Sequence, residues 1–96
     1  MELNDSLRFL DIDDLIVLSM KLEGHGIYAI ALRLGLSQAA ISLRNKKIED
    51  HLGPGIFVRR GRNSVLTPKG TRLAKCCRYA LRSLDVGTRE PFEQTI

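Results

Sequence analysis

The side chains best suited to bind another molecule lie in two short segments near the middle of the chain. The first is Ser37-Gln38-Ala39, which is followed one helical turn later by Ser42. A Gln side chain can form two hydrogen bonds with adenine, and Ala can pack on the methyl group of thymine. Ser is a typical helix N-cap, and the free amides at a helix N-terminus bind phosphate. The segment therefore predicts contacts with DNA, or else an ordinary capped surface helix.

The second segment, Arg59-Arg60-Gly61-Arg62-Asn63, places three arginines beside a glycine. The short segments Ile56-Phe57-Val58 and Ser64-Val65-Leu66 flank it, which predicts two strands joined by a basic turn. A turn that buries little surface does not need three arginines for packing. Arginine suits phosphate contacts and insertion into a narrow minor groove, so this hairpin is predicted to contact DNA.

Charge is distributed unevenly along the 96 residues, whose net charge is +4. Residues 1–32 carry a net charge of −4, residues 33–82 carry +10, and residues 83–96 carry −2. A stretch of +10 can attract a polyanion such as DNA, or it can be a well-solvated basic surface. Charge alone does not separate the two interpretations.

Apolar periodicity predicts the helices that position these segments. We expect helices over residues 12–23, 27–34 and 38–52, and the turn between the last two has helix-turn-helix spacing. Gly35 and Gly53 are expected to end the second and third helices. The side chains expected to face inward are Ile12, Leu15, Leu18 and Leu22 in the first helix, Ile27, Ile30, Ala31 and Leu34 in the second, and Ala40, Ile41, Ile48 and Leu52 in the third.

A longer helix is predicted to begin with Thr67 as its N-cap and Pro68 at its first position, and to reach about Leu84. The residues expected to form a dimer interface on it are Leu73, Cys76, Cys77, Ala80, Leu81 and Leu84. Four of them recur at the 3.5-residue period of a two-helix seam, so two copies are expected to pair antiparallel. The alternative is that the stripe packs on its own domain through Leu15 and Leu18.

These elements predict a mainly α fold, a winged helix-turn-helix. Residues 1–10, with Leu3, Leu7 and Leu10 at a helical spacing, form an N-terminal extension, and residues 11–66 form the DNA-binding domain. Residues 67–84 form the dimerisation helix, and residues 85–96 are expected to be a flexible tail.

The sequence offers no catalytic or metal-binding constellation, so the protein is expected to be neither an enzyme nor a holder of a cofactor. His25 and His51 are isolated, and the adjacent Cys76 and Cys77 fit neither a disulfide scaffold nor a metal-ligand pair. One of the two thiols is expected in the core and the other partly exposed. No apolar run approaches the ~18 residues of a membrane span, and the acidic start is unlike a secretory signal. We therefore expect a cytoplasmic, nucleoid-associated protein.

Several motifs occur together in a fixed order. They are residues 31–42, which end in Ser37-Gln38-Ala39-Ala40-Ile41-Ser42, then Ile48, Glu49, Leu52 and Gly53, then Ile56-Phe57-Val58-Arg59, Gly61-Arg62, and Leu66-Thr67 with Gly70. In this order they resemble the N-terminal winged helix-turn-helix domain of LysR-type transcriptional regulators, over residues 12–84. The resemblance implies a homodimer that binds specific double-stranded DNA to regulate transcription. It also implies that Ser37, Gln38, Ser42 and Arg59 contact DNA.

The full set of residues expected at DNA is Ser37, Gln38, Ala39, Ser42, Leu43, Asn45, Lys46, Arg59, Arg60, Arg62 and Asn63. Two of them depart from the family pattern. Asn45 occupies a position that is usually aliphatic, so its amide is expected to find a backbone, phosphate or base partner. Leu43 occupies a position where the family often has a polar or basic residue facing the DNA backbone.

Longer family members also carry a C-terminal co-inducer domain that this sequence does not show. The sequence is therefore either an excerpt or a stand-alone version, and the character of its last residues favours the second. A different class of function is a protein–protein module that pairs with a full-length transcription regulator and modulates it. The wing arginines argue against a module of this kind, which would not need them.

Overall fold

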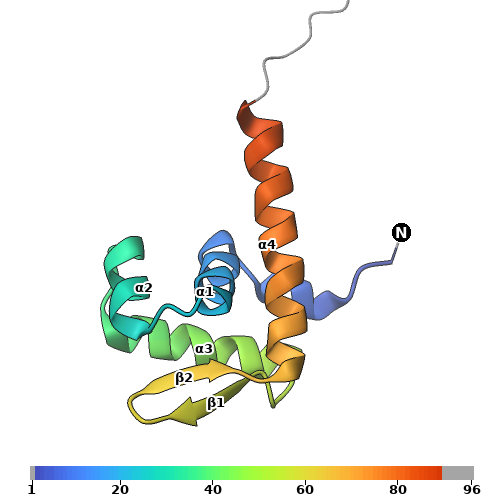
Figure 1. Cartoon of the computed structure of the whole chain (residues 1–96). Coiled ribbons are helices and arrows are strands. Elements are labelled where there is room, and N and C mark those ends of the chain that lie inside the picture. The colour runs from blue at the N-terminus through green and yellow to red at the C-terminus, as the bar shows by residue number, and fades with distance from the viewer. Residues whose placement is uncertain (1, 90–96) are drawn as a thin grey trace, which may run out of the picture.

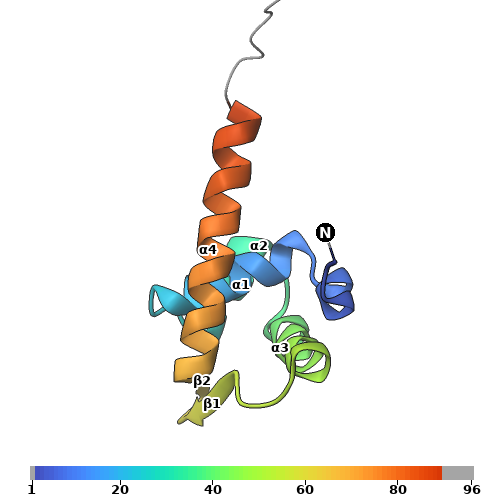
Figure 2. The ribbon, with the colours of Figure 1, turned by 90° about the vertical axis from the view of Figure 1, so that its right-hand side faces the viewer.

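The computed structural model describes residues 2–89, which form a helical body with a small hairpin beneath it and one long projecting helix (Figure 1). The elements are a 3-10 helix η1 (Asp5–Phe9), α1 (Ile12–Leu22), α2 (Ile27–Leu34), α3 (Gln38–Leu52), β1 (Phe57–Arg60), β2 (Asn63–Leu66) and α4 (Pro68–Arg89). Figure 2, turned by 90°, shows α1 beside the lower half of α4, and η1 near α3. Within residues 2–89, no helix is both long enough and apolar enough to span a membrane.

Local capping explains why the first three helices begin and end where they do. Asp11 and Asp14 form a reciprocal capping box at the start of α1. Gly35 ends α2 with φ of 66°, a left-handed conformation that costs a residue with a Cβ more than glycine. Two residues later, Ser37 caps α3 by accepting a hydrogen bond from the Ala40 amide. The predicted bounds of α2 and α3 are confirmed, and the predicted short element in the N-terminal extension is the 3-10 helix η1.

The core consists of two packed groups that meet at α1. One contains Leu18, Ile48, Ile56, Ala74 and Cys77, and the other contains Val17, Ile30, Ala31 and Ile41. Neighbouring residues of α1, Val17 and Leu18, contribute to different groups, so this helix holds the two halves together. The inward face of α1 therefore differs from the prediction: Ile12 is 50% exposed, while Asp14 and Lys21 are buried.

The hairpin is longer and tighter than predicted. β1 and β2 are antiparallel and pair Phe57 with Leu66 and Arg60 with Asn63, so only Gly61 and Arg62 form the turn. Gly61 has φ of 58° and Arg62 has no positive φ, as in the two-residue turns that begin with glycine. The expectation that Arg59, Arg60 and Asn63 belong to the turn is wrong. A two-residue turn matches the twist of paired strands, and the ladder extends to meet it.

The long helix α4 begins as predicted, with the Thr67 hydroxyl accepting a hydrogen bond from the Gly70 amide. It continues to Arg89, so the expectations that the helix ends near Leu84 and that a flexible tail begins at residue 85 are wrong for residues 85–89. The Arg89 guanidinium lies 2.8 Å from the Asp85 carboxylate, an i,i+4 pair that supports this last turn. The rest of the predicted tail, residues 90–96, lies outside the described residues.

Candidate nucleic-acid interface

The first turns of α3 and the hairpin lie at the end of the molecule opposite to the direction in which α4 projects (Figure 1). The predicted contact residues that are exposed there are Ser37, Gln38, Ala39, Ser42, Leu43 and Lys46 on α3, and Arg59, Arg60, Arg62 and Asn63 on the hairpin. A groove of about 270 Å³ separates the two elements, and Ser42, Lys46, Arg59 and Ser64 are among the residues that line it. The fold thus gathers both predicted segments on one surface.

Ser37 combines a structural role with a free polar atom. Its Oγ lies 3.0 Å from the Ala40 amide and accepts a hydrogen bond from it. The hydroxyl proton remains available to donate to another group, and the side chain is exposed. An N-cap serine of this kind can donate to a phosphate oxygen while it still stabilises the helix.

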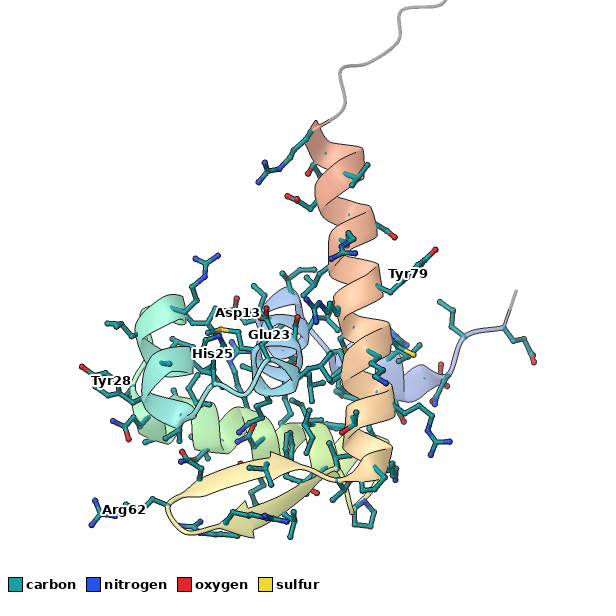
Figure 3. The ribbon with its side chains drawn as sticks, in the orientation of Figure 1. Asp13, Glu23, His25, Tyr28, Arg62 and Tyr79 are labelled. Carbon is teal, nitrogen blue, oxygen red and sulfur yellow. The ribbon has the colours of Figure 1, made fainter. Side chains whose placement is uncertain are left out.

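Within the part of the chain that the structure describes, the three hairpin arginines have no carboxylate partner. The ion pairs among residues 2–89 involve no side chain of Arg59, Arg60 or Arg62. Arg62 extends from the tip of the hairpin away from the body (Figure 3). These guanidinium groups are therefore ready to meet an anion without first breaking an ion pair.

Glu49 holds the hairpin against α3, a role that the sequence analysis missed. Its Oε2 accepts hydrogen bonds from the Ile56 amide at 3.0 Å and the Phe57 amide at 3.2 Å. The Ile56 amide precedes β1, and the Phe57 amide begins it. Glu49 belongs to one of the sequence motifs, but nothing in its local sequence reveals a partner seven residues away.

A buried amine from α1 holds the other strand. Lys21 Nζ donates to the Ser64 carbonyl oxygen at 2.8 Å and to Ser64 Oγ at 3.1 Å, and it lies 5.5 Å from the centre of the Phe57 ring. Only 7% of Lys21 is exposed, and this burial lowers the pKa of the amine. A lysine among the apolar residues of a helix was the available signal, but its partner is 43 residues away.

Asn45 lies between α3 and β2 rather than on the exposed surface. Its Nδ2 is 3.5 Å from Ser64 Oγ, and its Oδ1 is buried with no hydrogen-bond partner among the described residues. Within residues 2–89 the amide thus meets a serine side chain, and a contact of Asn45 with DNA stays a prediction. Asn63, in turn, ties the hairpin to the loop before α2, since its Oδ1 is 3.4 Å from the Ile27 amide.

Acidic residues at the start of α1 neutralise two cations of α3. The Arg44 guanidinium lies 2.7 Å from the Asp11 carboxylate and 2.9 Å from that of Asp14, and Lys47 pairs with the same two carboxylates. Burial raises the pKa of Asp11, but the hydrogen bond from Arg44 and its charge outweigh this, so the net pKa is lowered. In the fold, these carboxylates therefore offset part of the positive charge of residues 33–82.

The predicted dimer stripe on α4 divides into a covered part and a free part. Cys77 is 4% exposed and packs in the core with Leu18, and Leu73 packs against the same group. This corrects the expectation for Cys77, because an α1–α4 contact within one chain covers it, as the alternative interpretation held. Cys76 and Leu84 are exposed, while Ala80 and Leu81 are half-buried.

Sequence comparison places residues 13–71 in the family described as bacterial regulatory helix-turn-helix protein, lysR family. The chain is 36% identical over 77 residues to nodulation protein D 1 of Mesorhizobium japonicum, covering 78% of this chain and 24% of that protein. It is also 36% identical over 78 residues to the HTH-type transcriptional regulator DgdR of Burkholderia cepacia, covering 81% of this chain and 26% of that protein.

Two solved structures share the fold. The probable transcriptional regulator PA0477 from Pseudomonas aeruginosa matches 94% of this chain with a TM-score of 0.73 at 29% identity, over 31% of its own chain. Full-length CbnR complexed with its target DNA matches 83% of this chain with a TM-score of 0.70 at 26% identity, over 28% of its own chain. The predicted winged helix-turn-helix fold is confirmed.

The chain spans about a quarter of the length of the relatives that it matches. The matched segment begins in α1 and ends in the first turn of α4, so it contains α2, α3 and the whole hairpin. The protein is therefore a member of the lysR family of bacterial regulatory helix-turn-helix proteins.

Proposed function

We propose that the chain binds specific double-stranded DNA through α3 and the hairpin, and that it regulates transcription as a homodimer. The observation that carries this proposal is the gathering, at one end of the molecule, of the exposed first turns of α3 and three arginines that have no ion-pair partner among residues 2–89. The similarity to CbnR, which was solved with its target DNA, supports it.

In this proposal the two elements divide the work between base recognition and backbone contact. The N-terminal turns of α3 enter the major groove, where Gln38 can pair with adenine and Ala39 can meet a thymine methyl group. Ser37 and the free amides at the start of α3 hold a phosphate. Arg59, Arg60 and Arg62 contact the backbone or the minor groove beside it.

A salt series tests DNA binding. Fluorescence anisotropy with random duplex should show affinity that falls steeply with salt, because each phosphate contact releases counterions. Arg62→Ala should reduce the slope of log K against log salt by about 1. The matched control is Arg89→Ala, which removes an exposed arginine at the opposite end and should leave the slope unchanged. Absence of binding at low salt, or equal effects of the two substitutions, would overturn the proposed interface.

Specificity is tested at Gln38. Selection from a random duplex pool should yield a preferred site, and Gln38→Ala should cost about 1–3 kcal/mol on that site and little on random duplex. Equal losses on both duplexes would contradict a role in base readout.

Homodimer formation is proposed through the free part of α4. Its 22 residues extend about 33 Å, and residues 82–89 are all exposed, so the distal half has no partner within residues 2–89. Leu84, 52% exposed, continues the apolar stripe of α4 whose earlier members, Leu73 and Cys77, pack against the core group of Leu18. An isolated helical end of this kind is marginal in water, and a second copy lying antiparallel would stabilise it.

Sedimentation equilibrium tests the dimer. Leu84→Asp should shift the protein towards the monomer, whereas Val86→Asp should not, because Val86 lies about 200° away around the helix and is similarly exposed. A wild-type protein that remains monomeric at tens of micromolar would contradict the pairing.

A further inference from the structure

Leu43 is a large apolar side chain on the outward face of α3, where 67% of it is exposed. It takes no part in either core group, and the inward face of the helix is formed by Ile41 and Ile48. Ala39 lies one turn earlier, is also exposed, and shares this face with Leu43. The fold therefore gives no reason for a leucine at this position, although a partner surface would.

Each cation of α3 has a carboxylate within 4 Å, although the pair formed by Lys46 is exposed to solvent. Arg44 and Lys47 pair with carboxylates of α1, and Lys46 Nζ lies 3.8 Å from Asp50 Oδ2. The commonest specific contact in the major groove is a cation bound to guanine O6 and N7. With Arg44 and Lys47 paired in this way, the outward face of α3 presents an apolar pair, Ala39 and Leu43. This pair lies beside the polar residues Gln38 and Ser42 and the exposed Lys46.

We propose that Leu43 determines specificity by packing on the 5-methyl group of a thymine in the major groove. The inference rests on the proposed function, since it needs α3 to lie in that groove. The thymine methyl is the apolar group that the major groove exposes, and leucine gains by covering it whereas cytosine or guanine would leave the side chain in a polar setting. The half-site therefore contains a thymine opposite Leu43.

Replacing single thymines by deoxyuridine tests the contact, because uracil pairs like thymine but lacks the methyl group. The duplex is the preferred site recovered by selection, and each thymine is replaced in turn. At the thymine opposite Leu43 in each half-site, deoxyuridine should weaken binding of the unaltered protein about fourfold, the effect of leaving one methyl-sized apolar group unburied. Leu43→Ala should abolish the difference between thymine and uracil at that position.

Leu32→Ala is the matched control. Leu32 is a similarly exposed leucine, 72%, but it lies on α2. This variant should keep the fourfold discrimination at the Leu43 position. Both substitutions remove exposed apolar atoms, so neither should prevent folding, and circular dichroism of the two variants checks this.

A gain-of-specificity variant provides the second arm. Leu43→Arg places a guanidinium on the exposed face of α3, so selection should change the preferred base at the same position from thymine to guanine. Binding to duplex DNA with equal affinity for thymine and uracil at every position would overturn the role of Leu43 and leave the proposed function intact. Absence of duplex binding at low salt would overturn both.

Discussion

Gly70, in the first turn of α4, is the point of closest approach between that helix and the segment leading into β1. A Cβ at this position would lie 2.1 Å from the Ile56 carbonyl oxygen and 3.0 Å from the Ile56 carbonyl carbon. The same oxygen accepts hydrogen bonds from the Thr67 amide at 3.0 Å and from Thr67 Oγ1 at 3.2 Å. The helix, its cap and the start of the hairpin therefore share one crowded contact, and Gly70→Ala should disrupt it.

The size of the effect follows from the geometry. Contacts of a Cβ are not shorter than 3.0 Å, so α4 and Ile56 would have to separate by about 0.9 Å. Ile56 is fully buried, and overpacking of a core costs about 1–3 kcal/mol. Weakening the Thr67 hydrogen bonds costs about 1 kcal/mol more, while alanine gains about 1 kcal/mol of helix propensity. The net loss in the free energy of unfolding should be about 2 kcal/mol.

Urea unfolding followed by circular dichroism measures this loss. With a slope of about 1–1.5 kcal/mol per molar urea, the midpoint should fall by about 1.5 M at a fixed protein concentration. The control is Gly87→Ala in the same helix, where nothing lies within 4 Å of the new Cβ and the substitution should raise stability by up to about 1 kcal/mol. If Gly70→Ala were as stable as the unaltered protein, the close approach of α4 to Ile56 would be refuted.

Three further predictions concern stability and reactivity. Glu49→Ala should lower the free energy of unfolding in urea by about 2 kcal/mol and weaken DNA binding, because two amides of the hairpin lose their acceptor. Glu49→Gln should retain most of the stability and most of the DNA affinity, since it keeps an acceptor oxygen. Asp11→Asn keeps an N-cap oxygen but removes a carboxylate whose pKa is lowered in the fold. The stability that the charged carboxylate contributes is present above pH 3.8 and is lost as the pH falls further, so the melting temperature of the variant should decline less on acidification. An identical decline in the two proteins would contradict the ion pair with Arg44. Burial and the neighbouring Cys76 raise the pKa of Cys77 to about 11, so an aromatic disulfide reagent at pH 8 should modify one exposed thiol rapidly, and Cys76→Ser should remove that fast phase.

Local signals predicted most of the architecture. The bounds of α2 and α3 depend on Gly35, Ser37 and Gly53, whose effects act within a turn, and the structure has those bounds as predicted. The start of α4 depends on Thr67 and Pro68 in the same way. The exposed residues at the start of α3 could also be recognised, because a helix N-terminus and its first side chains are adjacent in sequence.

The contacts that hold α3 and the hairpin in place depend on the tertiary structure. Lys21 meets Ser64 across 43 residues, and Arg44 meets Asp11 across 33, so no local pattern indicates either pair. The strands extend to Arg60 and Asn63 because they pair with each other, which residue types alone do not show.

The helix α4 shows the distinction most clearly. The sequence by itself determined that an apolar stripe runs along this helix, since the stripe depends only on spacing. Which part of it the chain covers depends on where α1 lies and how far it reaches: Cys77 falls against Leu18, and Leu84 lies beyond the body. Periodicity specifies the direction in which side chains point, but burial requires a surface to point at, and that surface exists only after the helices have packed.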